Sequence, residues 1–257
     1  MSESLPLQDK VIFITGATSG FGSAFAKKFI EKGARVVATG RRTERLEELQ
    51  DTLDSDNLYT LSLDVRDQKA VESAILGLPS AFADVDVLIN NAGLALGLNL
   101  APDASLVEWE QMVDTNIKGM MYCTHAMLPD MIRRGGGYII NIGSIAGSYP
   151  YPCGNVYGAT KAFVRQFSLN LRADLLGKNI RVTNIEPGLA ETEFSLVRLH
   201  GDQEKAKAIY AGIQPLSAED IADTALFCLT CPPHVNVNTI EVMPVNQAFS
   251  PFAIYRE

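Results

Sequence analysis

Short apolar segments alternate with amphipathic segments along almost the whole chain. Seven runs rich in β-branched and other apolar residues have the length of buried strands, at residues 11–15, 34–40, 58–63, 86–90, 138–143, 180–186 and 235–242. Between them, helical spacing of apolar residues or a helix-forming composition predicts helices over about residues 23–32, 43–53, 67–76, 105–134, 157–172 and 217–229. No linker rich in Pro or Ser interrupts this order. The pattern predicts an α/β fold, a single domain over 1–257 with a parallel, doubly wound sheet of about seven strands.

Residues 189–211 break this regularity. Their periodicity is weak and their charges are mixed, which indicates a loop with short helices. Such loops often cover substrates, so we expect a substrate lid at about residues 189–215. Ser217 to Asp220 has the spacing of a capping box for the helix that follows. The C-terminal tail carries no assignable structure.

Composition narrows the possible partners. The net charge of −8 argues against binding to nucleic acid or to an anionic membrane surface. No apolar run approaches the ~18 residues of a membrane span. The first ten residues lack the basic and apolar regions of a signal peptide, so we expect a cytoplasmic protein. Cys228 and Cys231 form a CxxC pair, which we interpret as thiols packed at a helix end, and we expect no metal site.

The first strand runs directly into a glycine-rich turn that carries Gly16, Gly20 and Gly22, and a helix follows. A strand, a glycine-rich turn and a helix form the context of a dinucleotide site, because the backbone can approach a pyrophosphate at a helix N-terminus. The spacing is GxxxGxG rather than GxGxxG. The alternative interpretation is a tight turn in which glycine serves packing alone.

The end of the second strand indicates which dinucleotide binds. An NAD enzyme would place an acidic residue there for the ribose, yet no Asp or Glu occurs between Ala34 and Thr43. Arg41 and Arg42 occupy this position, and a guanidinium can bind a 2′-phosphate, which favours an NADP site. The alternative interpretation is that both are ordinary surface arginines. Asp64, at the third strand end, could accept from the adenine amino group or cap the next helix.

Candidate catalytic chemistry lies between residues 144 and 161. Ser144 follows the fifth strand, and Tyr157 and Lys161 are four residues apart on one helix face. A nearby cation lowers the pKa of a phenol, which would make Tyr157 a usable proton donor or acceptor. A Tyr and Lys at this spacing are also common by chance. Asn116 interrupts an apolar helix stripe and is either a bridge to a catalytic water or a satisfied core residue.

Taken together, these motifs resemble the short-chain dehydrogenase/reductase family over essentially the whole chain. The resemblance rests on Thr15-Gly-x3-Gly20-x-Gly22, Asn90-Asn91-Ala92-Gly93, Tyr157-x3-Lys161 and Pro187-Gly188, together with Asp64, Asn116, Ser144 and Thr192. It implies a Rossmann-type fold and a catalytic tetrad of Asn116, Ser144, Tyr157 and Lys161. It also implies an NADP site formed by Gly16, Thr18, Ser19, Gly20, Phe21, Gly22, Arg41, Arg42, Asp64, Val65, Asn91, Ala92, Gly93, Tyr157, Lys161, Pro187, Gly188 and Thr192.

The family resemblance implies a role for each of these groups. Tyr157 would be the general acid/base and Ser144 would hydrogen-bond the substrate oxygen. Lys161 would lower the pKa of Tyr157 and hold the nicotinamide ribose, and Asn116 would anchor a water relay behind it. Thr192 would bind the carboxamide. The family also suggests a homotetramer built partly on the helix of Tyr157.

Within the family, segments such as Thr39-Gly-Arg-Arg42 and Gly154 to Ser168 look like those of bacterial NADP-dependent 3-hydroxy acid dehydrogenases. Those enzymes oxidise serine and allo-threonine and reduce malonic semialdehyde, and a similar group reduces sulfoacetaldehyde to isethionate. A small anionic substrate needs a cation, so we expect Tyr151 and Arg198 to clamp its carboxylate or sulfonate. The alternative for these two residues is a surface Arg and a Tyr that only packs. The alternatives for the whole protein are a reductase of bulkier neutral ketones and a non-catalytic NADP sensor.

Overall fold

Seven parallel strands form one twisted sheet. The computed structural model describes residues 6–249, and the strand order in the sheet is β3-β2-β1-β4-β5-β6-β7. The strands are β1 (Val11–Ile14), β2 (Arg35–Gly40), β3 (Leu58–Ser62), β4 (Val87–Asn90), β5 (Gly137–Ile142), β6 (Ile180–Pro187) and β7 (Thr239–Val242). All six neighbouring pairs are parallel. The predicted doubly wound α/β sheet is confirmed, with strand bounds that differ by a few residues.

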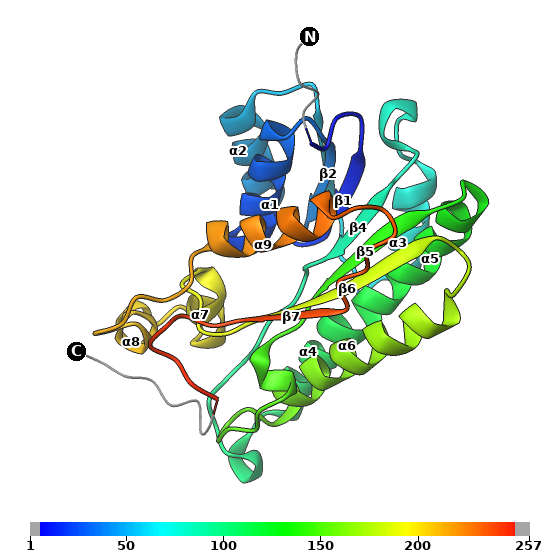
Figure 1. Cartoon of the computed structure of the whole chain (residues 1–257). Coiled ribbons are helices and arrows are strands. Elements are labelled where there is room, and N and C mark those ends of the chain that lie inside the picture. Colours follow the sequence, from blue (N-terminus) through cyan, green and yellow to red (C-terminus); the bar gives the residue numbers. More distant parts are fainter. Residues whose placement is uncertain (1–5, 250–257) are drawn as a thin grey trace.

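Helices cover both faces of the sheet (Figure 1). They are α1 (Gly20–Glu31), α2 (Thr43–Leu53), α3 (Gln68–Leu76), α4 (Leu106–Val113), α5 (Met120–Arg133), α6 (Asn155–Asp174), α7 (Glu193–Arg198), α8 (Gln203–Ile209) and α9 (Ala218–Thr230). The helices α1 and α9 pack together on one face, and α3, α5 and α6 lie on the other (Figure 1). The capping box at Ser217 and Asp220 begins α9 as predicted.

Burial on both faces explains why the strands are continuous apolar runs. Ile12 and Ile14 of β1 belong to the core beneath α1 and α9, where Phe25 and Phe29 stack. Phe13, between those two isoleucines, belongs to the second core beneath α3, α5 and α6. Successive side chains of a strand point to opposite faces, so a strand covered twice needs an apolar residue at nearly every position.

The long helix predicted over residues 105–134 contains a change of winding. α4 passes into a π-helical segment, η3 (Asp114–Gly119), which leads into α5. One π-helical turn shifts the faces of the residues that follow, and such turns are frequent at functional sites. Asn116 lies inside η3 and is buried.

Helix α6 buries a different face from the one that its phenylalanines suggest. Phe163 and Phe167 stack on each other, with ring centroids 5.6 Å apart, and are only partly buried. The buried stripe contains Tyr157, Lys161 and Val164. Tyr157 and Lys161 therefore share the face that is directed into the protein.

The segment after β6 leaves the two helical layers. Figure 1 shows α7 and α8 beyond the sheet, next to the end of β6 at Pro187. This agrees with the predicted loop with short helices. Among residues 6–249, no helix is long and apolar enough to cross a membrane. The expectations for the first five residues and for residues 250–257 of the tail lie outside the described residues.

Candidate active site

A cavity of about 590 Å³ lies at the carboxyl ends of the strands. This volume is within the range of cofactor and small-molecule sites. Its lining comes from the turn after β1, the ends of β2 to β6, helix α6 and the segment that contains α7. Of the predicted site residues, it includes Gly16, Thr18, Ser19, Gly20, Phe21, Arg41, Arg42, Asp64, Val65, Asn91, Ala92, Gly93, Ser144, Tyr151, Tyr157, Lys161, Pro187, Gly188, Thr192 and Arg198.

The glycine-rich turn leaves no room for side chains at two positions. A Cβ on Gly22 would lie 2.2 Å from the Gly16 carbonyl oxygen, and one on Gly16 would lie 2.9 Å from Ala92 Cα. Gly16 also has a φ of +69°, which L-residues rarely adopt. The Asn91 side chain donates to the carbonyl oxygens of Thr15 and Gly16 and so fixes the turn. Gly22 therefore serves packing and does not line the cavity.

The N-terminus of α1 opens into this cavity. Its N-cap, Ser19, makes no side-chain hydrogen bond to the helix backbone in the described structure. The first N–H groups of a helix lack partners inside the helix and carry its positive dipole end, which suits a pyrophosphate. The geometry fits a dinucleotide, because a glycine-rich turn, a helix N-terminus and two arginines meet in one cavity.

The charged residues at the ends of β2 and β3 have different partners. Arg42 donates hydrogen bonds to the Thr18 and Ser19 side chains and to the Glu193 carboxylate. Asp64 accepts from the Arg66 guanidinium, which lowers the pKa of the Asp64 carboxyl. Asp64 does not cap the next helix, because Asp67 is the N-cap of α3. The capping alternative for Asp64 is therefore wrong, and the adenine contact stays a prediction.

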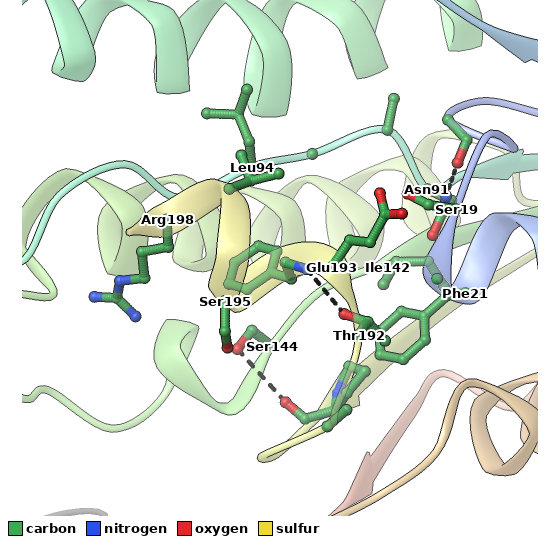
Figure 2. A pocket seen from close by; sticks show the side chains of 18 of the residues that line it. Ser19, Phe21, Asn91, Leu94, Ile142, Ser144, Thr192, Glu193, Ser195 and Arg198 are labelled. Carbon is green, nitrogen blue, oxygen red and sulfur yellow. Dashed lines mark hydrogen bonds between the residues drawn. The ribbon is translucent and has the colours of Figure 1, made fainter. Parts of the chain in front are cut away.

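Ser144, Tyr157 and Lys161 meet at the centre of the cavity. The Ser144 hydroxyl lies 3.5 Å from the Pro187 carbonyl oxygen, at the end of β6 (Figure 2). The Lys161 ammonium nitrogen lies 2.8 Å from the Ile142 carbonyl oxygen, to which it donates, and 5.8 Å from the centre of the Tyr157 ring. The ends of β5 and β6 and helix α6 thus meet at this point of the cavity, although Ser144 and Pro187 are 43 positions apart in the sequence.

Burial has the largest effect on the pKa values of Tyr157 and Lys161. It raises the pKa of Tyr157, and a hydrogen bond with Ser144 and the charge of Arg198 offset this only in part. Burial lowers the pKa of Lys161 to about 8. Since Lys161 is bonded to Ile142, the predicted lowering of the Tyr157 pKa by Lys161 stays a prediction. A buried phenol of high pKa is protonated at neutral pH and can act as an acid.

Asn116 does not line the cavity, and both polar atoms of its side chain have hydrogen-bond partners. Its side-chain oxygen accepts from the Leu94 N–H, and its amide donates to the Leu94 carbonyl and to the Thr160 hydroxyl. A Cβ added at Gly93 would lie 3.4 Å from the Asn116 oxygen and 3.5 Å from Lys161 Nζ, so the two side chains flank Gly93. The side chain is thus a satisfied buried Asn that fixes the loop after β4, and the water relay stays a prediction.

The far end of the cavity is mostly apolar but contains one guanidinium. The Arg198 guanidinium carbon lies 5.5 Å from the centre of the Tyr151 ring and 5.8 Å from that of the Tyr157 ring. It donates hydrogen bonds to the carbonyls of Gly97 and Cys153 at 3.3 and 3.5 Å, and it also hydrogen-bonds the Tyr151 side chain. Within residues 6–249, no carboxylate forms an ion pair with Arg198, so its charge is available to an anion.

The sequence did not single out several residues that line the cavity. Phe194 packs on the Tyr157 ring with centroids 5.6 Å apart, and the Tyr210 hydroxyl donates to the Ala190 carbonyl. Gln247 accepts from the Leu189 N–H and covers Gly188. The available sequence signal for Glu193 and Phe194 was that they directly follow Thr192, which the motifs did single out.

This constellation of a glycine-rich turn and a Ser, Tyr and Lys around one cavity defines a nucleotide-dependent dehydrogenase site. The family description "short chain dehydrogenase" matches residues 10–200. The chain belongs to this family, and the resemblance inferred from the motifs is confirmed.

Particular relatives narrow the group. The chain is 55% identical over 247 residues to the NADP-dependent 3-hydroxy acid dehydrogenase YdfG of Salmonella typhi, covering 96% of this chain and 99% of that one. It is 53% identical over 246 residues to serine 3-dehydrogenase of Rhizobium radiobacter, covering 96% and 98%. A solved closed form of serine dehydrogenase complexed with NADP+ has a TM-score of 0.92 and 53% identity, covering 96% of this chain and 100% of that one.

Proposed function

We propose that this protein is an NADP-dependent oxidoreductase that interconverts a small 3-hydroxy acid and its carbonyl form. The proposal rests on one arrangement: a dinucleotide-type cleft, a Ser and Tyr pair and an arginine that has no carboxylate partner among residues 6–249 line one cavity. Relatives at 53–55% identity over almost the whole chain are named 3-hydroxy acid or serine dehydrogenases, which supports it.

Different residues of the cleft would bind different parts of the cofactor. The N-terminus of α1 and the turn from Gly16 would hold the pyrophosphate, and the arginines after β2 would meet the 2′-phosphate. Lys161 would hold the nicotinamide ribose, and Thr192 the carboxamide. When bound, the nicotinamide supplies or accepts a hydride.

The protein's own part of the reaction is proton transfer and orientation. Ser144 holds the substrate oxygen next to the Tyr157 hydroxyl. In reduction, Tyr157 gives its proton to that oxygen, and in oxidation it takes the proton back. Because burial raises the pKa of Tyr157, the ligand-free protein is poised as the acid for reduction. Oxidation requires that positive charge near the phenol lower this pKa.

Arg198 and Tyr151 would bind the anionic end of the substrate. A partly buried guanidinium without a carboxylate partner favours an anion, because an unpaired buried charge is costly. The same cation disfavours the neutral-ketone alternative. The cavity is also lined by Leu94, Leu98 and Phe194, so its remaining surface suits a short carbon chain.

A steady-state assay of the purified protein tests the proposal. It compares NADPH with NADH, using malonic semialdehyde and sulfoacetaldehyde for reduction, and serine, allo-threonine and 3-hydroxypropionate for oxidation. We expect NADPH preference and turnover of the carboxylates. If sulfoacetaldehyde were reduced with by far the highest kcat/KM, the alternative substrate would be assigned. Turnover with NADH alone would overturn the prediction of NADP, and NADPH binding without turnover of any substrate would favour the sensor.

We also propose that the protein works in the cytoplasm as a homotetramer. The partly buried, stacked Phe163 and Phe167 on α6 provide an apolar surface for a second copy. Gel filtration with light scattering would test this, and a monomer at micromolar concentration would contradict it. No metal is invoked in this mechanism.

A further inference from the structure

Glu193 connects the lid to the cofactor end of the cleft. It is the first residue of α7, yet its carboxylate accepts a 3.0 Å hydrogen bond from Arg42, 151 positions earlier in the chain. Arg45 lies 3.6 Å from its other oxygen. Burial opposes ionisation of Glu193, but the hydrogen bond and charge of Arg42, helped by Ser19 and Arg45, outweigh it and lower the pKa of the carboxyl.

Arg42 is fully engaged by this arrangement. Its Nε and Nη2 donate to the Thr18 hydroxyl at 3.3 and 3.0 Å, and Nη2 also donates to the Ser19 hydroxyl at 2.9 Å. Its Nη1 donates to Glu193. Each guanidinium nitrogen therefore already has a partner, and Arg42 joins the glycine-rich turn to the lid.

Arg41 differs sharply from its neighbour. It lines the same cavity, and its charge helps to lower the pKa of Asp64, but within the described part of the chain its side chain makes no hydrogen bond or ion pair. A guanidinium without a partner is available for bidentate binding of a phosphate. The adjacent arginines thus have different electrostatic environments, which the sequence alone does not reveal.

The contact also lies where the lid meets the turn. A Cβ added at Gly20 would lie 3.3 Å from Thr192 Cβ, so the start of α7 packs directly on the turn. Figure 2 shows Glu193 extending from the lid segment towards Ser19. Ser19, Arg42 and Glu193 all line the cavity. In the proposed cofactor site, this part would hold the pyrophosphate that NADPH and NADH share.

We propose that Glu193 is a positioning residue that assigns the two arginines separate tasks. Through Glu193, Arg42 holds the lid against the pyrophosphate site and slows the dissociation of either nicotinamide cofactor. Arg41 remains to recognise the 2′-phosphate and sets the preference for NADPH. This division rests on the proposed cofactor site and would replace the simpler expectation that both arginines bind the phosphate.

Dissociation rates measured by stopped-flow displacement of NADPH and of NADH from the intact protein test this division. We expect Glu193→Gln and Arg42→Gln each to raise koff by about three- to fivefold for both cofactors, the upper range for a half-exposed ion pair. The double variant should be no faster than Arg42→Gln alone, because that change already removes the bond to Glu193. Arg41→Gln should weaken equilibrium binding of NADPH about tenfold or more and change that of NADH less than twofold.

Two controls separate the ion pair from general damage. Glu204→Gln removes an exposed carboxylate of α8 that does not line the cavity, and it should leave both rates unchanged. The charge reversal Arg42→Glu with Glu193→Arg should restore slow dissociation, which a merely structural role would not produce. High salt should accelerate dissociation more from the wild type than from Glu193→Gln, because the variant lacks the screened ion pair.

Four results would overturn the proposal. Additive effects of the two single variants would show that Arg42 and Glu193 act independently. Selective loss of NADPH binding in Arg42→Gln would place the 2′-phosphate on Arg42. If the wild type bound neither cofactor, the proposed function would fail first and this inference with it, whereas normal binding with unchanged rates in both variants would refute this inference alone.

Discussion

Removing the charge of Arg198 should change the choice of substrate more than the chemistry. In Arg198→Gln the side chain keeps hydrogen-bonding capacity towards Gly97 and Cys153, but loses the charge next to the rings of Tyr151 and Tyr157. The proposed carboxylate of the substrate then meets a neutral amide. The variant therefore isolates the charge-assisted part of substrate binding.

The expected loss follows from the kind of bond that is removed. Hydrogen bonds to charged groups contribute about 1.5–3 kcal/mol, and each 1.36 kcal/mol is about a factor of ten in rate. Because Arg198 is partly buried and lacks a carboxylate partner among residues 6–249, screening by water is limited. We expect kcat/KM for 3-hydroxypropionate to fall about 10- to 150-fold.

The assay compares two substrates that differ in charge. 3-Hydroxypropionate is measured beside 3-hydroxypropionamide, which lacks the carboxylate, and the quantity of interest is the ratio of the two kcat/KM values. Arg198 also lowers the pKa of Tyr157 through its charge, but this effect acts on both substrates and cancels in the ratio. Lys207→Gln, which removes an exposed lid cation outside the cavity, serves as the control.

An equal loss for the acid and the amide would refute the reasoning. Arg198 would then act on Tyr157 or on the lid rather than on the substrate anion. Arg198→Lys should recover part of the preference for the acid, since it keeps the charge but not the bidentate geometry.

Three further changes test other parts of the site. Tyr157→Phe should lower kcat about 10²- to 10⁴-fold, the usual contribution of a general acid or base, while calorimetric NADPH affinity changes little; unchanged turnover would exclude Tyr157 as the acid. Lys161→Met should abolish activity yet raise stability at pH 7 by on the order of 1–3 kcal/mol, because folding lowers the Lys161 pKa from 10.5 to about 8. Between pH 8 and 10.5 the unfolded chain binds a proton that the folded protein does not, so the destabilisation by buried Lys161 is complete below pH 8 and fades towards pH 10.5. Thermal melts of the wild type and Lys161→Met whose difference does not change with pH would contradict this. Gly22→Ala should lower the melting temperature by several degrees, since its Cβ meets the Gly16 carbonyl at 2.2 Å, and more than Gly177→Ala, where only a φ of +79° is strained.

Local patterning in the sequence was enough for the strands and most helices. The run Val11 to Ile14 is apolar at every position because both faces of its strand are covered, and this signal is readable without a structure. The order of strands and helices, together with the glycine-rich turn, predicted the sheet, and several candidate site residues were placed at the ends of its strands. These features depend on neighbouring residues, so the sequence records them directly.

The fine structure of the site depended on contacts that are distant in the sequence. Periodicity could not show that Asn116 lies in a π-helical turn, because a helix that continues through such a turn keeps its apolar residues. Nor does the spacing of Phe163 and Phe167 show that Val164, together with Tyr157 and Lys161, lies on the buried face of α6.

The charge environment of each site residue was likewise decided by the fold. The sequence gives Arg41 and Arg42 the same side chain, and only the position of α7 pairs Arg42 with Glu193 and leaves Arg41 available. Burial raises the pKa of Tyr157 and lowers that of Lys161, against the effect expected from their spacing alone. Sequence fixes which groups are present, whereas desolvation and pairing depend on which distant segments pack around them.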